Sequence, residues 1–287
     1  MVQIKTSEEF KKQLKCMNYQ VIDNLYSGGA YCYIYFSGNG IYDPDTLEAF
    51  NKTIVKEDRY EWKRWKADSK RIIFVRDIYK EWYFEGINEE CNTIDKVYEL
   101  LKTLTAGYKV ITVGSSAGGY AAVLFGIMLK AERVFAFSAQ FDLTEWLEKR
   151  NLLISRPFLQ QEQYINIKSL LQNSNVEIYY FFPAYVKADN IQAEIVKNMK
   201  NVHSFGVKSK LHGKALYPNS IPDVLSFDME KLENLEKKYQ NKVVSPFRMA
   251  FFCSGFSKAI IGKIYNTIKP IYYFWNDWKR GKLKNNK

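Results

Sequence analysis

Ser116 stands at the centre of the pentapeptide Gly114-Ser115-Ser116-Ala117-Gly118, which has the pattern GxSxG. In this pattern the serine lies on a sharp turn between a strand and a helix, where a strained backbone exposes its Oγ. A serine hydroxyl held in this way can attack an acyl carbonyl when a neighbouring base removes its proton. The pattern therefore predicts a nucleophilic serine at position 116 and an acyl-serine intermediate.

The segments on both sides of Ser116 have the composition that such a turn needs. Residues 108–113 (YKVITV) are an apolar run typical of a buried strand, and residues 117–130 are rich in small residues and fit a helix. Small side chains let the strand and the helix approach closely. A nucleotide-binding turn is the alternative for a glycine-rich junction, but the sequence has neither GxGxxG nor GxxxxGK[ST].

The rest of the chain alternates between apolar runs and helical patterns. We expect a helix, alone or with an edge strand, in the first 22 residues, strands at residues 30–36, 71–75, 108–113, 133–138, 176–182 and 202–207, and helices at residues 45–56, 88–105, 117–130, 143–150, 191–199 and 221–239. This alternation predicts an α/β fold with a mostly parallel sheet and helices on both faces.

The sequence predicts one domain followed by an extension. The domain covers residues 1–241, with an insertion over the sheet expected at residues 151–174, and the extension covers residues 242–287. The first 15 residues are charged and lack the apolar segment of a secretion signal. No window of 18 residues is continuously apolar, so no membrane-spanning helix is expected.

The segment VGSSAGGYAAVLFG (residues 113–126) resembles the nucleophile elbow of the α/β-hydrolase superfamily. It is also similar to hydrolase-like proteins of bacterial surface-polysaccharide gene clusters. The superfamily resemblance covers residues 28–240 and implies the α/β-hydrolase fold with a triad of serine, histidine and an acid. The elbow is specific for the fold and the nucleophile, but it does not specify the substrate.

The chain has two histidines that could act as the base. His203 lies inside the expected strand 202–207, whereas His212 lies in a loop after it. The superfamily places the base in such a loop, so the resemblance implies His212. The acid is expected after the preceding strand, which implies Asp189, a residue that could instead cap a helix. Asp142, after strand 133–138, is the alternative acid.

A tetrahedral intermediate also needs hydrogen-bond donors for its oxyanion. The first expected donor is the backbone N–H of Ala117, directly after the nucleophile. The second is expected from the loop at residues 36–40 (FSGNG), where Gly38 and Asn39 both remain candidates. This loop departs from the HGGG form of lipases and esterases, and an ordinary Gly-Asn-Gly turn is the alternative interpretation.

The positive charge of the chain is concentrated in the extension. Residues 242–287 contain ten Lys or Arg and one acid, a net charge of +9 out of +11 for the whole chain. Ten aromatic residues lie among these charges between Phe247 and Trp278. Three roles fit this composition: helices packed on the domain or a partner subunit, an anionic membrane surface, or nucleic acid. The near-neutral domain argues against nucleic acid.

These observations favour a serine esterase of the deacetylase type that acts on a carboxylic ester, either a small molecule or an acylated glycan. The first alternative is an O-acyltransferase that modifies a bacterial surface polysaccharide, and the second is a non-catalytic α/β-hydrolase-like binding protein. No cofactor or metal is expected. The scattered cysteines, Cys16, Cys32, Cys91 and Cys253, are expected to be reduced thiols in a cytoplasmic protein. Peripheral attachment to the inner face of the membrane is the location that the membrane role of the extension would imply.

Overall fold

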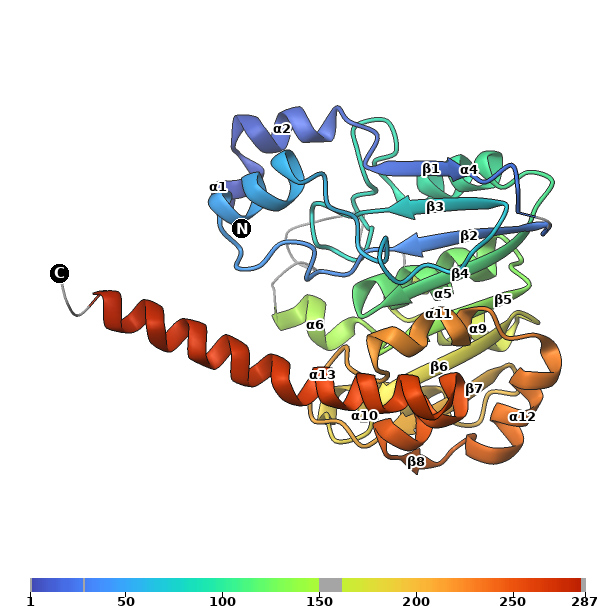
Figure 1. Ribbon diagram of the computed structural model, residues 1–287. Coiled ribbons are helices and arrows are strands. Elements are labelled where there is room, and N and C mark those ends of the chain that lie inside the picture. Colours follow the sequence, from blue (N-terminus) through green and yellow to red (C-terminus); the bar gives the residue numbers. More distant parts are fainter. Residues whose placement is uncertain (1, 28, 150–161, 285–287) are drawn as a thin grey trace.

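Eight strands form one sheet at the centre of the computed structural model, which describes residues 2–27, 29–149 and 162–284 (Figure 1). Their order in the sheet is β1-β3-β2-β4-β5-β6-β7-β8. Only β1 runs antiparallel to its neighbour, β3, and every other adjacent pair is parallel. The strands are β1 (Tyr19–Asp23), β2 (Tyr31–Phe36), β3 (Arg71–Val75), β4 (Lys109–Ser115), β5 (Arg133–Phe137), β6 (Glu177–Pro183), β7 (Val202–Val207) and β8 (Val243–Val244). The predicted mostly parallel sheet is confirmed.

Helices cover both faces of this sheet, as predicted. Alternate side chains of each strand point to opposite faces, and since both sets are apolar, both faces must be covered. Ile34 and Phe36 belong to the core shared with α4 (Ile94–Leu104), α5 (Ala117–Met128), α9 (Lys168–Gln172) and α10 (Lys187–Val196). Tyr33 and Tyr35 belong to the second core, shared with α11 (Ile221–Leu225), α12 (Met229–Tyr239) and the start of α13 (Pro246–Lys284). Both cores are continuous along the strands, so the sheet is a rigid base for the loops at its edges.

A third, smaller core holds the N-terminal helices against the loop that follows β2. It joins α1 (Val2–Lys5), α2 (Glu8–Leu14), α3 (Leu47–Phe50) and η1 (Asn51–Lys56) through Ile4, Phe10, Phe50 and Ile54. The helix predicted at residues 45–56 is present, but it is α-helical only at its start and π-helical afterwards.

The helix predicted over residues 221–239 is wrong as a continuous element, because the chain breaks between α11 and α12. Asp228 begins α12 as its N-cap, and its carboxylate accepts a hydrogen bond from the Lys231 N–H (2.9 Å). The Phe227 carbonyl accepts from the Arg133 guanidinium (2.8 Å), and the Phe227 side chain is buried. At the break, the Phe227 carbonyl is therefore hydrogen-bonded to Arg133, a distant residue that the helical periodicity of this segment does not predict.

Part of the predicted insertion, residues 151–161, lies outside the described residues. The remainder forms α8 (Glu162–Ile165) and α9, which lie after α6 (Thr144–Lys149) in the chain. The Tyr120 hydroxyl of α5 donates to the Tyr164 carbonyl (2.5 Å), and Ile167 and Leu171 are fully buried. These short helices therefore pack tightly on the α5 side of the sheet.

The C-terminal extension begins with β8, which adds two residues to the sheet edge, and continues as α13. The backbone of α13 is kinked at Gly255 (φ 78°, ψ 174°). The first half of α13 contacts α11 and the short helix η3 (Pro218–Ser220), and its distal part extends away from the domain (Figure 1). In the part of the chain that the structure describes, no helix combines the length and hydropathy needed to cross a bilayer.

Candidate active site

Ser116 lies at the sharp turn between β4 and α5. Its backbone has φ 56° and ψ −125°, in the left-handed half of conformational space that non-glycine residues rarely adopt. Two hydrogen bonds hold it there: the Ser116 N–H donates to the Phe137 carbonyl (2.9 Å), and the Ser116 carbonyl accepts from the Tyr120 N–H (3.0 Å). The surrounding sheet and helix therefore impose a strained backbone on the predicted nucleophile.

The two glycines of the pentapeptide are required by close backbone contacts. A Cβ added to Gly114 would lie 1.9 Å from the Gly118 carbonyl oxygen. One added to Gly118 would lie 2.3 Å from the carbonyl oxygen of Phe36, on β2. No rotamer change relieves an overlap with backbone atoms, so α5 can begin directly above β4 and β2 only because both residues lack a side chain.

We expect Gly114→Ala to destabilise the fold by about 3 kcal/mol or more, because the new methyl group forces β4 and α5 apart. Urea unfolding followed by circular dichroism measures this change. Gly29→Ala is the matched control, since the nearest atoms to its added Cβ are 3.9 Å away. Equal stability of the two variants would show that the elbow tolerates a wider separation than its geometry implies.

Three predicted residues form one continuous chain of hydrogen bonds. His212 Nε2 lies 2.9 Å from Ser116 Oγ, and His212 Nδ1 lies 2.8 Å from one carboxylate oxygen of Asp189 and 3.0 Å from the other. Asp189 is buried in the first turn of α10, whereas the His212 side chain is 43% exposed in the loop after β7. Asp189 does not cap α10, whose N-cap is Val186. The structure thus brings together the nucleophile, base and acid expected from the sequence.

The alternative base and acid lie elsewhere and have other partners. His203 lies within β7, where its ring stacks on Tyr179 and its Nε2 lies 2.6 Å from a Glu177 carboxylate oxygen. The Asp142 carboxylate accepts hydrogen bonds from Thr144 and Asn166 at the start of α6. Among the hydrogen bonds of the described residues, none joins either side chain to Ser116 or His212.

Comparison with known proteins gives structural likenesses only. Neither a protein-family model nor a curated protein matches the chain. Similar solved structures include the capsule O-acetyltransferase of Neisseria meningitidis serogroup A (15% identity, TM-score 0.49, 68% of this chain and 85% of the other). Others are MenH from S. aureus (13% identity, TM-score 0.44, 78% and 99%) and a lipase-esterase related protein from Clostridium acetobutylicum (12% identity, TM-score 0.46, 76% and 99%).

The chain's own topology identifies its fold. A mostly parallel sheet carries a strained serine between a central strand and a helix, and Asp189 and His212 follow Ser116 in that order after later strands. The chain has the α/β-hydrolase fold. In this fold the residue after the serine and a loop after an early strand supply the oxyanion donors. The corresponding positions in this chain are Ala117, at the start of α5, and the loop at residues 37–40, which follows β2.

Glu61 already accepts a hydrogen bond from Gly38, one of the two residues of that loop whose backbone N–H was a candidate oxyanion donor. Its Oε2 accepts a hydrogen bond from the Gly38 N–H at 2.7 Å. In the described part of the chain, no hydrogen bond uses the N–H of Asn39 or that of Ala117. Gly38 also lies close to the nucleophile, since a Cβ placed on it would be 3.8 Å from the Ser116 Cβ. Glu61 therefore anchors the loop beside Ser116, and of the two candidates Gly38 and Asn39 it occupies the N–H of Gly38.

Burial raises the pKa of the Glu61 carboxyl, while the Gly38 N–H and the charge of Arg59 act in the opposite direction. Nothing in the sequence marked Glu61, because residues 57–70 show no periodicity and the contact with Gly38 spans 23 positions. The side chain is recognised only once the loop and the elbow are placed together.

A second loop, after β3, supports the same region. The buried Asp77 carboxylate accepts four hydrogen bonds, of 2.7 to 3.1 Å, from backbone N–H groups of residues 79–83. Burial raises the pKa of Asp77 to about 6, although these N–H groups lower it. The Tyr83 hydroxyl, also buried, donates to the Ser37 carbonyl at 2.8 Å. Asp77 thus shapes a loop whose Tyr83 holds the start of the loop at residues 37–40.

Ser138 fixes the loop that carries His212. It follows β5 with φ 47°, is fully buried, and its Oγ accepts a hydrogen bond from the Gly213 N–H at 3.1 Å. No motif in the sequence marks Ser138 as part of a site. Its position directly after an apolar strand, at the edge where α/β sites form, is the signal that could have found it.

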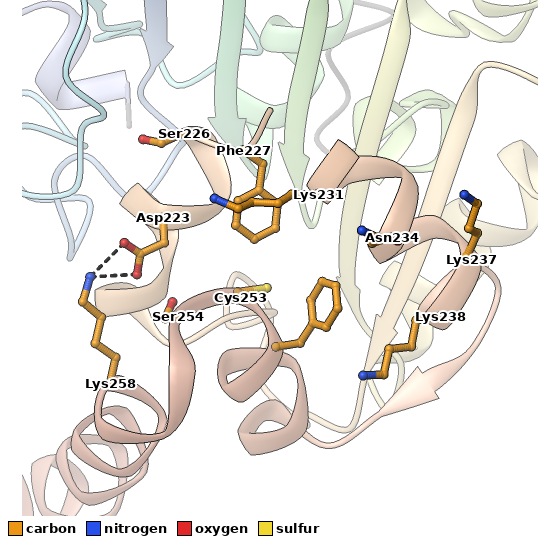
Figure 2. A pocket seen from close by; sticks show the side chains of 11 residues that line it. Asp223, Ser226, Phe227, Lys231, Asn234, Lys237, Lys238, Cys253, Ser254 and Lys258 are labelled. Carbon is orange, nitrogen blue, oxygen red and sulfur yellow. Dashed lines mark hydrogen bonds and ion pairs between the residues drawn. The ribbon is translucent and has the colours of Figure 1, made fainter. Parts of the chain in front are cut away.

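Among the described residues, no group of three or more His, Cys, Asp or Glu side chains is arranged to hold a metal ion. A cavity of about 900 Å³ lies between α11, α12 and α13, away from the triad (Figure 2). Its lining includes Lys231, Lys237 and Lys238, but neither Ser116 nor His212. This cavity is therefore separate from the hydrogen-bonded residues Ser116, His212 and Asp189.

Proposed function

We propose that this protein is a serine esterase that hydrolyses a carboxylic ester, of a small molecule or an acylated glycan, through an acyl-Ser116 intermediate. The observation that carries the proposal is the unbroken hydrogen-bond chain from Asp189 through His212 to the Ser116 Oγ. A serine on an elbow becomes a nucleophile when a base within hydrogen-bond reach accepts its proton and an acid orients that base.

The reaction has two acyl-transfer steps. His212 Nε2 takes the Ser116 proton as Oγ attacks the ester carbonyl, and the resulting imidazolium is stabilised by Asp189. The tetrahedral intermediate collapses, the C–O bond to the alcohol breaks, and His212 returns the proton to the leaving oxygen. Water then attacks the acyl-serine with His212 again as base, which releases the carboxylic acid and regenerates Ser116.

The N–H groups of Ala117 and Asn39 bind the oxyanion in this proposal. Ala117 is the first residue of α5, and the N–H groups of a first helical turn have no partner within the helix. The positive end of the α5 dipole adds to this stabilisation. Gly38 is not assigned as a donor, because Glu61 already accepts its hydrogen bond.

Glu61 acts in this proposal as a positioning residue for the oxyanion loop. We expect Glu61→Ala to lower kcat by roughly tenfold or more with little change in KM, since a loosened loop weakens an interaction made mainly in the transition state. Glu61→Gln keeps an acceptor for the Gly38 N–H and should retain most of the activity. Steady-state kinetics on a chromogenic acetyl ester separate the two; a glutamine variant as impaired as the alanine variant would contradict the positioning role.

Hydrolysis and acyl transfer share the first half of this reaction, and the acceptor in the second half distinguishes them. The direct experiment is incubation of the full chain with a chromogenic acetyl ester, with and without a polysaccharide acceptor. Esterase activity predicts free acetate in equal amount to the alcohol released, unaffected by the acceptor. Acetate recovered on the polysaccharide would instead identify an O-acyltransferase. The absence of any covalent labelling by a fluorophosphonate would identify a non-catalytic binding protein.

A further inference from the structure

One face of α13 is firmly attached to the domain. Met249, Cys253 and Ala259 are buried, and a Cβ added to Gly262 would lie 2.5 Å from the ring of Tyr217. Gly262 therefore lets the helix backbone lie almost directly on the segment before η3. The apolar and small residues at these positions of α13 are therefore accounted for by contact with the domain.

Polar contacts fix the same attachment. The Asn219 side chain donates to the Lys258 carbonyl at 2.7 Å, and the Lys258 ammonium pairs with both carboxylate oxygens of Asp223 at 2.8 Å. Figure 2 shows the latter ion pair at the edge of the cavity between α11 and α13. The orientation of α13 about its axis is thereby set, and so is the face that it turns to solvent.

The face turned to solvent is strongly apolar. Large hydrophobic side chains that are between 43% and 60% exposed recur along this part of α13: Phe251, Phe256, Ile261, Ile264, Tyr265 and Ile268. Part of this face forms a shallow apolar groove lined by Phe247, Phe256, Ile260, Ile264, Thr267 and Ile268, with Lys263 beside them. A contiguous exposed patch of this kind normally marks an interaction surface.

The sequence of this part of α13 is positively charged. Residues 246–268 contain no acid, and their cations are Arg248, Lys263 and Lys258, of which Lys258 is paired with Asp223 on the attached face; the whole extension carries a net charge of +9. The Lys263 ammonium lies 5.7 Å from the centre of the Phe247 ring, at the border of the groove. Isoleucine and phenylalanine next to lysine and arginine are the composition of a helix that lies in the interface of an anionic membrane.

We propose that the exposed face of α13 binds an anionic phospholipid surface, with its isoleucine and phenylalanine side chains among the acyl chains and its cations at the headgroups. Charge complementarity selects this occupant. A second copy of the chain would bring two faces of like charge together, which is unfavourable. Nucleic acid would contact the cations and aromatic rings but would leave the exposed isoleucines in water.

Vesicle flotation with the full chain tests this proposal. Vesicles of phosphatidylcholine with about 30% phosphatidylglycerol should carry the protein upward, and pure phosphatidylcholine vesicles should carry at least about tenfold less. Raised salt should weaken binding because it screens the headgroup attraction. Equal flotation with both compositions, or none with either, would overturn the proposal.

Paired variants assign the binding to this face. Phe256→Glu combined with Ile264→Glu should lower the bound fraction about tenfold or more, because both side chains leave the apolar region and add negative charge. Met229→Glu on α12 is the matched control, since Met229 is 52% exposed and lies outside the patch, and it should bind like the native chain. Circular dichroism melting verifies that all variants fold. A loss of binding in the control equal to that in the double variant would contradict the assignment.

The competing occupant has its own signature. Sedimentation velocity without vesicles should show a monomer for both the native chain and the double variant. A native dimer that the double variant converts to monomer would show that a second copy covers the patch, and would overturn the lipid proposal.

Discussion

Replacing Ser116 with alanine is expected to lower kcat for a chromogenic acetyl ester on the order of 10⁴-fold or more, with no loss of stability. The reason is that the variant has no atom that can form the acyl-enzyme, although the oxyanion donors and His212 remain in place. Initial rates at saturating ester measure the loss. Stability should be unchanged or slightly higher, because the methyl group of alanine fits where the serine Cβ already lies.

A second measurement separates loss of the nucleophile from loss of the site. A fluorophosphonate should label the native chain at one serine, and peptide mapping should place the label on Ser116. His203→Ala is a useful companion, because it removes the other histidine of the chain from β7 without touching the hydrogen-bond chain. Labelling of Ser116→Ala at the native rate would contradict the proposed nucleophile.

Replacing Asp189 with asparagine should have the second-largest effect, a loss in kcat on the order of 10³- to 10⁴-fold. Asparagine is nearly isosteric with aspartate, but it presents an NH₂ group and removes the negative charge that stabilises the imidazolium. The Asp189 side chain is only 1% exposed, so no solvent ion can substitute for it. The rate constant for fluorophosphonate labelling, measured against pH, should fall together with kcat.

Asp142→Asn is the control for this variant, since Asp142 was the alternative acid and has no contact with His212. It should keep activity within a few fold of native and lose at most part of the hydrogen bonding of the Asp142 carboxylate with Thr144 and Asn166, which is worth about 1 kcal/mol. If Asp142→Asn lowered kcat more than Asp189→Asn, Asp142 and not Asp189 would be the acid that orients His212.

The elbow could be predicted from sequence because its determinants are local. Gly114 and Gly118 lie two positions on either side of Ser116, and the overlap that excludes a side chain at Gly114 is with the Gly118 carbonyl itself. The choice of Asp189 and His212 as partners of Ser116 also required the chain order known for the superfamily. The number of residues between them does not show whether they are close in space. The parallel sheet followed from apolar runs that alternate with helices.

Other parts of the site depend on contacts that no local pattern encodes. Glu61 reaches Gly38 from a segment without periodicity, and Ser138 reaches the His212 loop from the end of β5, two strands away from β7 in the sheet. The break at Phe227 depends on Arg133, 94 positions earlier. In each case a long-range hydrogen bond fixes the local conformation. Residue propensities and local sequence patterns therefore do not predict that conformation.

The unequal exposure of Asp189 and His212 has a consequence for chemical modification. A reagent that alkylates imidazoles can reach the His212 ring from solvent, whereas a carbodiimide cannot reach the buried Asp189 carboxylate in the folded chain. Of the three hydrogen-bonded side chains, the Ser116 hydroxyl and the His212 imidazole are therefore the two that solvent can reach. A reagent in solution can therefore affect Asp189 only indirectly, by modifying the His212 ring that is hydrogen-bonded to its carboxylate.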